Sequence, residues 1–324
     1  MPEAFVIDLQ APDIDRWRRG NTGVDWVHRL DSDDRDADAP RVMVQVLTHG
    51  NEICGAIALD WLLRQITTQG WRPRRGSLTL VFANVQAYQR FDPEDPFSSR
   101  CVDEDYNRVW GDDALFSARD SVELRRAREL RPFVDEADLL LDIHSMSEAC
   151  RPLMVCGLAD KNAAFARQLG VPGDLLVDTG HPAGLRMVDR GGFADPASPK
   201  HALLIECGQH WERAAGAVAI DTLVRLLGLA GLADEQWVAS NSRLPLPVRQ
   251  HLVRVTEAVV ARSSELRFLV PAVGLSVVAK AGTPIAQDGE HVWVAPYDNT
   301  VLVMPGTRNL KAGGTAVRLG RFED

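Results

Sequence analysis

Residues 42–55, "VMVQVLTHGNEICG", decide the fold of this 324-residue chain, because a strand gives way to a helix within them. The apolar run 42–47 is typical of a buried strand. Residues 52–69 then carry apolar side chains at helical spacing, and residues 76–85 return to a β-rich run that starts at a glycine. The pattern therefore predicts a strand–helix–strand unit.

The same alternation continues along the chain. A helical pattern covers residues 121–137, and "DLLLDIH" at 138–144 indicates another buried strand. Further strands are predicted at 151–157, 174–180 and 201–207, with helices near 160–170 and 211–230. Alternating strands and helices favour an α/β fold in which helices cover a sheet.

The pattern changes near residue 231. A proline-containing segment is followed by short β-branched runs separated by Gly, Pro, Asn and Asp, which is typical of a small β-rich module. We therefore predict two domains, a catalytic domain over 1–235 and a small C-terminal β-rich domain over 245–324.

Composition excludes several classes of partner. The net charge is −9, with 45 acidic and 36 basic residues, so we expect no binding to nucleic acid or to anionic membranes. No segment is apolar enough to predict a membrane span. The five cysteines include no Cys-x-x-Cys pair and do not suggest a disulfide framework. We expect a cytoplasmic protein with reduced thiols.

Polar residues stand at the ends of four predicted strands. His49, Asn84, His144 and Glu206 each follow or end an apolar run. In open α/β sheets, ligands bind at the carboxyl ends of the strands, where residues distant in sequence converge. The four positions therefore predict one site.

Two histidines and a glutamate form a typical catalytic zinc set, with three protein ligands and one open position. His49 and Glu52 would come from one turn, and His144 would be the distant third ligand. Each has an ordinary alternative: a loop histidine, a first-turn acid favoured by the helix dipole, and a core histidine. Asp142 would orient a ligand histidine or cap a turn.

Four short motifs carry a resemblance to a known family. The chain is similar to the succinylglutamate desuccinylase and aspartoacylase family, which is related to the zinc carboxypeptidases. The resemblance implies a carboxypeptidase-like α/β/α domain with a mixed sheet, a small β domain, and hydrolysis of N-acyl amino acids by zinc-bound water. The motifs are "THGNE" at 48–52, "YNRVW" at 106–110, "LDIHS" at 141–145 and "LLIECG" at 203–208, with a weaker match at 294–305.

The resemblance also implies roles for individual residues. It places one Zn²⁺ per subunit on His49, Glu52 and His144, and it makes Glu206 the general base. A carboxylate in a closed apolar site has a raised pKa, which suits it to exchange protons near neutral pH. The alternative for Glu206 is a structural carboxylate paired with an arginine.

The long segment between 84 and 113 supplies cations. By resemblance, Arg100 stabilises the oxyanion, and Asn107 and Arg108 bind a substrate carboxylate, a task that suits the planar guanidinium group. The alternative is a surface loop whose arginines are neutralised by its own acids. Those acids are Asp103, Glu104 and Asp105.

Two further substrate contacts are predicted less directly. Tyr297 falls near a substrate-contacting tyrosine of the family, or it belongs to the core of the β module. The segment before the general base lacks the family's tyrosine, and Arg186, Arg190 and Lys200 are its available cations. We predict Arg190 as the second substrate-carboxylate residue.

The sequence therefore predicts a zinc-dependent amidohydrolase acting on a small carboxylate-bearing N-acyl amino acid. One alternative is a zinc carboxypeptidase that trims short peptides in an open groove. The other is a non-catalytic relative that binds a small acid. Assembly into a homo-oligomer is left open.

Overall fold

The computed structural model describes residues 6–33, 36, 38–178, 180, 183–308 and 310–323. Its main feature is a mixed sheet of eleven strands. In chain order these are β1 (Val27–Asp31), β2 (Arg41–Val46), β3 (Ser77–Phe82), β4 (Leu139–Met146), β5 (Leu153–Val155), β6 (Asp174–Val177), β7 (His201–Gln209), β8 (His251–Val260), β10 (Val277–Val278), β13 (Thr300–Val303) and β14 (Thr315–Glu323). Across the sheet the order is β1-β3-β2-β4-β7-β5-β6-β8-β14-β13-β10.

Helices cover both faces of the first part of this sheet. They are α1 (Ile53–Gln69), α2 (Val85–Tyr88), α3 (Asp112–Leu115), α4 (Val122–Glu136), α5 (Asp160–Leu169), α6 (Arg213–Leu229) and α7 (Glu235–Asn241). Side chains of a strand alternate between faces, so Val42 and Val44 join the core under α1 and α6, and Met43 joins the core under α4. The predicted three-layer α/β/α fold is confirmed.

The middle strands bring the predicted site together. β2 runs parallel to both β3 and β4, and β4 runs parallel to β7, so their carboxyl ends meet at one edge. His144 on β4 lies directly beside Glu206 on β7 in the strand register. His49 follows β2 at the same edge.

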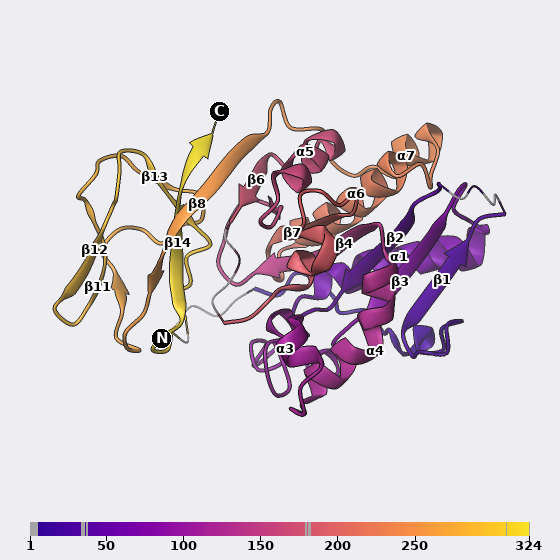
Figure 1. The fold of residues 1–324 in the computed structure, drawn as a ribbon, viewed down its shortest axis with the longest axis horizontal. Helices are drawn as coiled ribbons and strands as arrows, with labels where there is room; N and C mark the ends of the chain where they lie inside the picture. The colour runs from indigo at the N-terminus through magenta and orange to yellow at the C-terminus, as the bar shows by residue number, and fades with distance from the viewer. Residues whose placement is uncertain are drawn as a thin grey trace.

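The C-terminal strands continue the sheet. β8 pairs in parallel with β6, from Asp174 beside His251 to Val177 beside Arg254, and it pairs on its other side with β14. A second sheet of three strands completes this region: β9 (Arg267–Phe268), β11 (Pro284–Asp288) and β12 (His291–Val294). The β-rich region, with a small core of its own, lies to one side of the α/β body (Figure 1). The division into two domains at 235–245 stays a prediction.

Several elements differ from the sequence-based expectations. β1 forms within the first forty residues, which show no strand pattern, and it pairs antiparallel with β3 at the edge of the sheet. The proline-containing segment that follows residue 231 contains α7, whose N-cap residue Asp234 accepts a hydrogen bond from the Trp237 backbone amide. The predicted strand 174–180 ends at Val177, and Thr179 lies outside the described residues. No helix in the described ranges has the length and apolar character to cross a membrane.

Candidate active site

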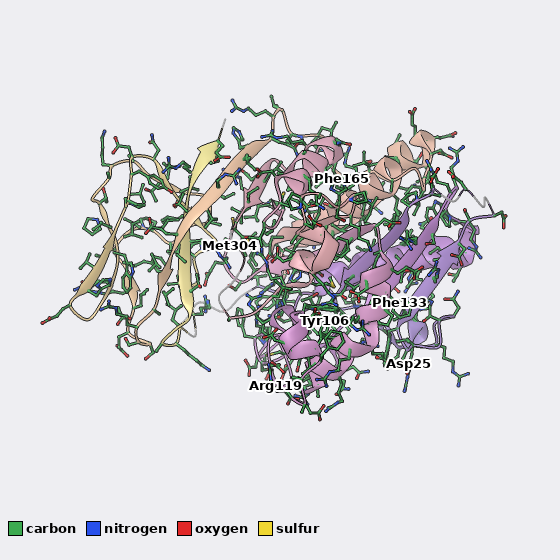
Figure 2. All side chains as sticks on the ribbon, viewed as in Figure 1. Asp25, Tyr106, Arg119, Phe133, Phe165 and Met304 are labelled. Atoms are coloured by element: carbon green, nitrogen blue, oxygen red, sulfur yellow. The ribbon has the colours of Figure 1, made fainter. Side chains whose placement is uncertain are left out.

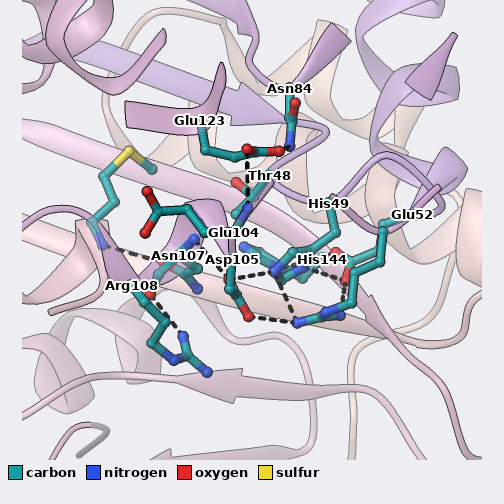
Figure 3. A network of polar contacts seen from close by, with 12 residues as sticks. Thr48, His49, Glu52, Asn84, Glu104, Asp105, Asn107, Arg108, Glu123 and His144 are labelled. Carbon is teal, nitrogen blue, oxygen red and sulfur yellow. Dashed lines mark hydrogen bonds and ion pairs between the residues drawn. The ribbon is translucent and has the colours of Figure 1, made fainter. Parts of the chain in front are cut away.

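Three buried side chains converge at the carboxyl edge of the sheet. His49 follows β2, Glu52 is the N-cap residue of α1, and His144 belongs to β4. The Nδ1 atoms of His49 and His144 lie 2.6 and 2.9 Å from the two oxygens of Glu52. One potential ligand atom from each residue lies within 4.8 Å of the others. Figure 3 shows the three side chains pointing toward one another.

Each imidazole also binds a second carboxylate through its other nitrogen. His144 Nε2 lies 2.7 Å from Asp142 Oδ2, and His49 Nε2 lies 3.0 Å from Asp105 Oδ1. The Thr48 hydroxyl in turn donates to Asp142 Oδ1 at 2.8 Å. Carboxylates in this position fix the orientation of metal-binding histidines.

The chemistry of the cluster fits a divalent cation. Burial alone would raise the pKa of Glu52, but the charges of His49 and His144 outweigh burial and hold that pKa well below its usual range. An anionic carboxylate and two imidazole nitrogens therefore face one point from positions that are 1–3% exposed. Two histidines and one glutamate are a donor set that catalytic zinc prefers.

Glu206 faces the same pocket from β7. Its side chain is buried, and its Oε2 atom has no hydrogen-bond partner among the described residues. Burial raises the pKa of Glu206 well above its usual range, and the nearby charge of Glu52 adds to the shift, whereas His144 opposes it. The carboxyl group is therefore suited to exchange a proton.

The loop between α2 and α3 brings Arg100 against the cluster. Arg100 Nη2 lies 2.9 Å from His49 Nε2 and 3.1 Å from Asp105 Oδ2. Gly50 permits this approach, because a Cβ atom there would lie 2.4 Å from backbone atoms of this loop and of α2. The Gly50 amide also donates to the Arg100 carbonyl. Asp105 therefore forms the ion pair with Arg100 that the surface-loop alternative predicted. Arg100 nevertheless lies at the site, in contact with His49.

Glu123, the second residue of α4, holds this loop in place. It is fully buried and accepts hydrogen bonds from the amides of Val102 and Asp103. Asn84 donates to the same carboxylate at 2.9 Å, as Figure 3 shows. Asn84 thus supports the loop and does not line the pocket, contrary to the expectation from its place at a strand end.

Asn107 and Arg108 follow in a short 3-10 turn. The backbone amide of Asn107 donates to the Asp105 side chain. The side-chain Oδ1 atom of Asn107 accepts from the Met187 backbone amide at 3.3 Å. Arg108 donates through Nη1 to the Asn107 carbonyl at 2.7 Å. Burial lowers the pKa of Arg108 to about 10, although Asp105 opposes the shift. Both residues line the pocket.

The pocket measures about 540 Å³ and lies between the α/β body and the C-terminal strands. Its outer wall comes from the C-terminal region, and its inner wall carries the candidate metal ligands together with Glu206, Arg100, Asn107 and Arg108. Met304 lies where the two parts approach each other, as Figure 2 shows, whereas Tyr106 lies inside the α/β body. The outer wall includes Met304, Lys311, Thr315 and Arg318.

Two predicted substrate contacts lie away from this pocket. Arg190 does not line the pocket, because its guanidinium group binds Asp112 and Asp135 in the α/β body. Tyr297 lines a separate hollow on the C-terminal strands, where Arg321 stacks on its ring at 4.2 Å. Both side chains are engaged by local partners that no sequence pattern predicts.

Other pocket residues were not predicted to act. Ser145 Oγ lies 2.8 Å from His210 Nδ1, and both line the pocket. Burial lowers the pKa of His210 to about 3, so this imidazole is neutral. Arg186, an open alternative in the sequence, lines the pocket, as does Arg318. Arg318 carries no local motif, and only the placement of β14 reveals it.

A buried cluster of two histidines and a glutamate beside a free carboxyl group, at the carboxyl edge of an α/β sheet, is an arrangement that metal-dependent hydrolases use. The chain belongs to the succinylglutamate desuccinylase/aspartoacylase family, because the sequence model of that family's catalytic domain matches residues 38–227. This match confirms the predicted family. Members of the family are deacylases.

Solved structures agree with this fold. Succinylglutamate desuccinylase from Vibrio parahaemolyticus superposes with a TM-score of 0.69 at 15% identity, over 93% of this chain and 87% of that chain. The enzyme from Chromobacterium violaceum gives 0.66 at 17% identity, over 93% and 90%. An ectoine utilization protein from Ruegeria pomeroyi, solved with product, gives 0.59 at 17% identity, over 87% and 85%. A search of curated protein sequences found no match.

Proposed function

We propose that this protein is a zinc-dependent amidohydrolase that cleaves the amide bond of a small N-acyl amino acid. The observation that carries the proposal is the convergence of His49, Glu52 and His144 in one buried cluster, beside Glu206 in the same pocket. These three residues would hold the ion. Zinc in such a site supplies Lewis-acid polarisation of a carbonyl group and lowers the pKa of water toward neutral.

Glu206 would move the proton. Its free Oε2 atom accepts a proton from the attacking water and then delivers it to the leaving nitrogen. The raised pKa supports the second step, because it keeps the carboxyl group protonated after the first step, so that a proton is available for the leaving nitrogen. A protein that only binds a small acid has no need of such a group.

Arg100 would stabilise negative charge on the carbonyl oxygen. Its guanidinium group lies beside His49 and Nη1 is 3.6 Å from Glu52, so it is held at the cluster and remains charged. Arg108, which donates a hydrogen bond to the Asn107 carbonyl, would bind a carboxylate of the substrate.

The pocket supports a small substrate over a peptide. Its volume of about 540 Å³ lies within the range of about 300–1,000 Å³ that is usual for small-molecule sites. A carboxypeptidase needs room for a chain that continues past the scissile bond, and the C-terminal strands wall this pocket. Assay of N-acetyl and N-succinyl amino acids beside short peptides, scored by amine release, separates the two activities.

The first prediction concerns Glu206→Gln. This change keeps the shape of the side chain and removes the proton acceptor, so we expect normal zinc content and a fall in kcat of about a hundredfold or more. Metal analysis and amine release measure the two quantities. Glu257→Gln on β8, at an exposed position, is the matched control. Unchanged turnover in Glu206→Gln would remove this residue from the mechanism.

We also propose that the protein acts in the cytoplasm on a small carboxylate-bearing substrate, without nucleic acid or membrane partners. Its five cysteines are all free thiols, which supports a reducing compartment. Whether it forms a homo-oligomer is a question for light scattering of the purified protein. Retention of the protein on nucleic acid or on anionic vesicles at physiological salt would contradict the proposed partners.

A further inference from the structure

A second charged cluster lies in the pocket beyond the candidate metal ligands. Arg186 donates to both oxygens of Asp178, at 2.6 and 2.8 Å, and to Asp189 at 2.6 Å. Both acidic side chains are 1% exposed. Arg186 is therefore already neutralised and held in one position, which makes it a structural arginine and a poor candidate for gripping a substrate.

Arg318 differs from Arg186 in this respect. It lies on β14 between Val317 and Leu319, whose side chains join the C-terminal core, so alternation turns Arg318 the other way, toward the pocket. Its nearest carboxylate is Asp178, whose Oδ2 atom lies 4.0 Å from Nε. Within the described residues its guanidinium group, which is only 14% exposed, forms no other ion pair, and the charge of Glu206 acts on it from farther away.

Arg108 approaches the same region from the α/β body. The residue after it, Val109, forms a β-bridge with Leu185, so the segments that carry Arg108 and Arg186 lie side by side. Within the described residues Arg108 has no ion-pair partner, and its hydrogen bond goes to a backbone carbonyl. Burial lowers the pKa of both Arg108 and Arg318, and Arg318 contributes to the shift of Arg108.

Among the described residues, Arg108 and Arg318 have no hydrogen-bonded carboxylate partner in this part of the pocket, although the charges of Asp105 and Glu206 act on them from farther away. Three guanidinium groups lie here, and Arg186 alone makes the hydrogen-bonded ion pairs to Asp178 and Asp189. Partly buried cations without partners are costly, so the arrangement favours an incoming anion. Guanidinium groups suit a carboxylate in particular, because their planar fork bonds both of its oxygens.

We propose that Arg318 is a substrate-binding residue that, together with Arg108, grips a carboxylate of the substrate. The inference rests on the proposed function for the nature of the ligand. It makes β14 part of the substrate site, so that the C-terminal region supplies a recognition group as well as a wall. It also replaces Arg190 as the second cation that selects the substrate.

The test compares Arg318→Met with Arg321→Met. Both changes remove one arginine from β14, but Arg321 stacks on Tyr297 in the separate hollow. Binding of succinate, a small carboxylate probe, to the purified metal-loaded protein is followed by titration calorimetry. We expect Arg318→Met to weaken binding by about tenfold to a hundredfold, the usual effect of losing a hydrogen bond to a charged group. Arg321→Met should bind as the unmodified protein does, and Arg318→Lys should recover part of the loss.

Kinetics supply a second readout once a substrate is known. A carboxylate held equally in the ground and transition states raises KM with little change in kcat when its partner is lost. We expect that split in Arg318→Met. Zinc content and melting temperature show whether the variant is folded, and Arg318→Lys replaces it if it is not.

The two proposals fail differently. If no N-acyl amino acid releases amine, the proposed function is contradicted, while the succinate comparison still decides the role of Arg318. Equal succinate affinity in Arg318→Met and the unmodified protein would overturn the inference, as would an equal loss in Arg321→Met. Failure of the unmodified protein to bind succinate would also overturn it.

Discussion

Each histidine of the candidate metal site is held by a carboxylate on both ring nitrogens. For His144 these are Glu52 on Nδ1 at 2.9 Å and Asp142 on Nε2 at 2.7 Å. If Asp142 accepts a hydrogen bond from the Nε2–H group, Nδ1 keeps its lone pair for an ion. The orientation of the ligand is thus set by a residue that does not itself reach the ion.

Asp142→Asn tests this arrangement. The amide cannot hold the ring as firmly in the required protonation state, so we expect zinc affinity to fall by about tenfold to a hundredfold while the protein stays folded. Competition for zinc with a chromophoric chelator measures the affinity. Asp221→Asn, another buried acid but paired with Arg225 on α6, should leave zinc affinity unchanged. Unaltered affinity in Asp142→Asn would show that the contact to His144 is dispensable.

At this scale the sequence predicts the ligands better than their supports. His49 and Glu52 are close in the chain, so their spacing alone marks them as a pair. Asp105 comes from a distant loop, and its contact with His49 depends on the burial of Glu123 beneath that loop. No local pattern shows which of three neighbouring acids turns inward.

At the scale of elements, the segment after Arg108 is joined to the segment before Arg186. Val109 bridges Leu185, and the Trp110 amide donates to the Leu185 carbonyl. Gly184 makes this contact possible: its φ is +146°, and a Cβ atom there would lie 2.2 Å from the Arg108 carbonyl oxygen. The two pocket segments thus pack directly against each other at Gly184, which has no side chain to keep them apart.

Gly184→Ala should loosen that junction. Backbone strain and the clash together are expected to cost at least about 2 kcal/mol of unfolding free energy. Displacement of Arg108 should also raise KM by about tenfold or more. Urea denaturation and steady-state kinetics give the two values. Gly191→Ala, at φ +53° with open space around it, should cost about 1–2 kcal/mol and leave KM alone. Equal changes in KM in the two variants would show that the contact between these two loops does not affect substrate binding.

Elements with strong periodicity were predicted well, and weak ones were not. α1 and β2 lie where the apolar pattern puts them, because both are buried against the core. β1 was missed since it is an edge strand whose side chains are mostly half-exposed. α7 was missed because its helix is short and has no buried residue to mark it.

At the scale of the whole molecule, the ion would link strands that the chain connects only distantly. Glu52 begins α1, while His144 lies on β4, so a shared ligand stabilises the folded state over the unfolded chain. An ion present at a thousand times its dissociation constant adds about 4 kcal/mol. Metal binding would therefore contribute to stability as well as to chemistry.

Removal of the metal tests this link. A chelator should lower the Tm of the purified protein by several degrees, and added Zn²⁺ should restore it. His144→Ala should contain little zinc and melt at one temperature with or without chelator. Differential scanning calorimetry with metal analysis measures both effects. A chelator shift of the same size in His144→Ala would place the stabilising ion at another site.

The sequence by itself determined the α/β/α layers, the family and the candidate metal ligands. These follow from apolar periodicity and from motifs a few residues long, which local chemistry shapes directly. Only the tertiary structure decided which cations face the pocket. Arg190 bound acids elsewhere, Tyr297 stacked on Arg321, and Arg318 came into the site, because β6 pairs with β8 and carries β14 against the α/β body. Such pairings join residues far apart in the chain, and no local pattern encodes them.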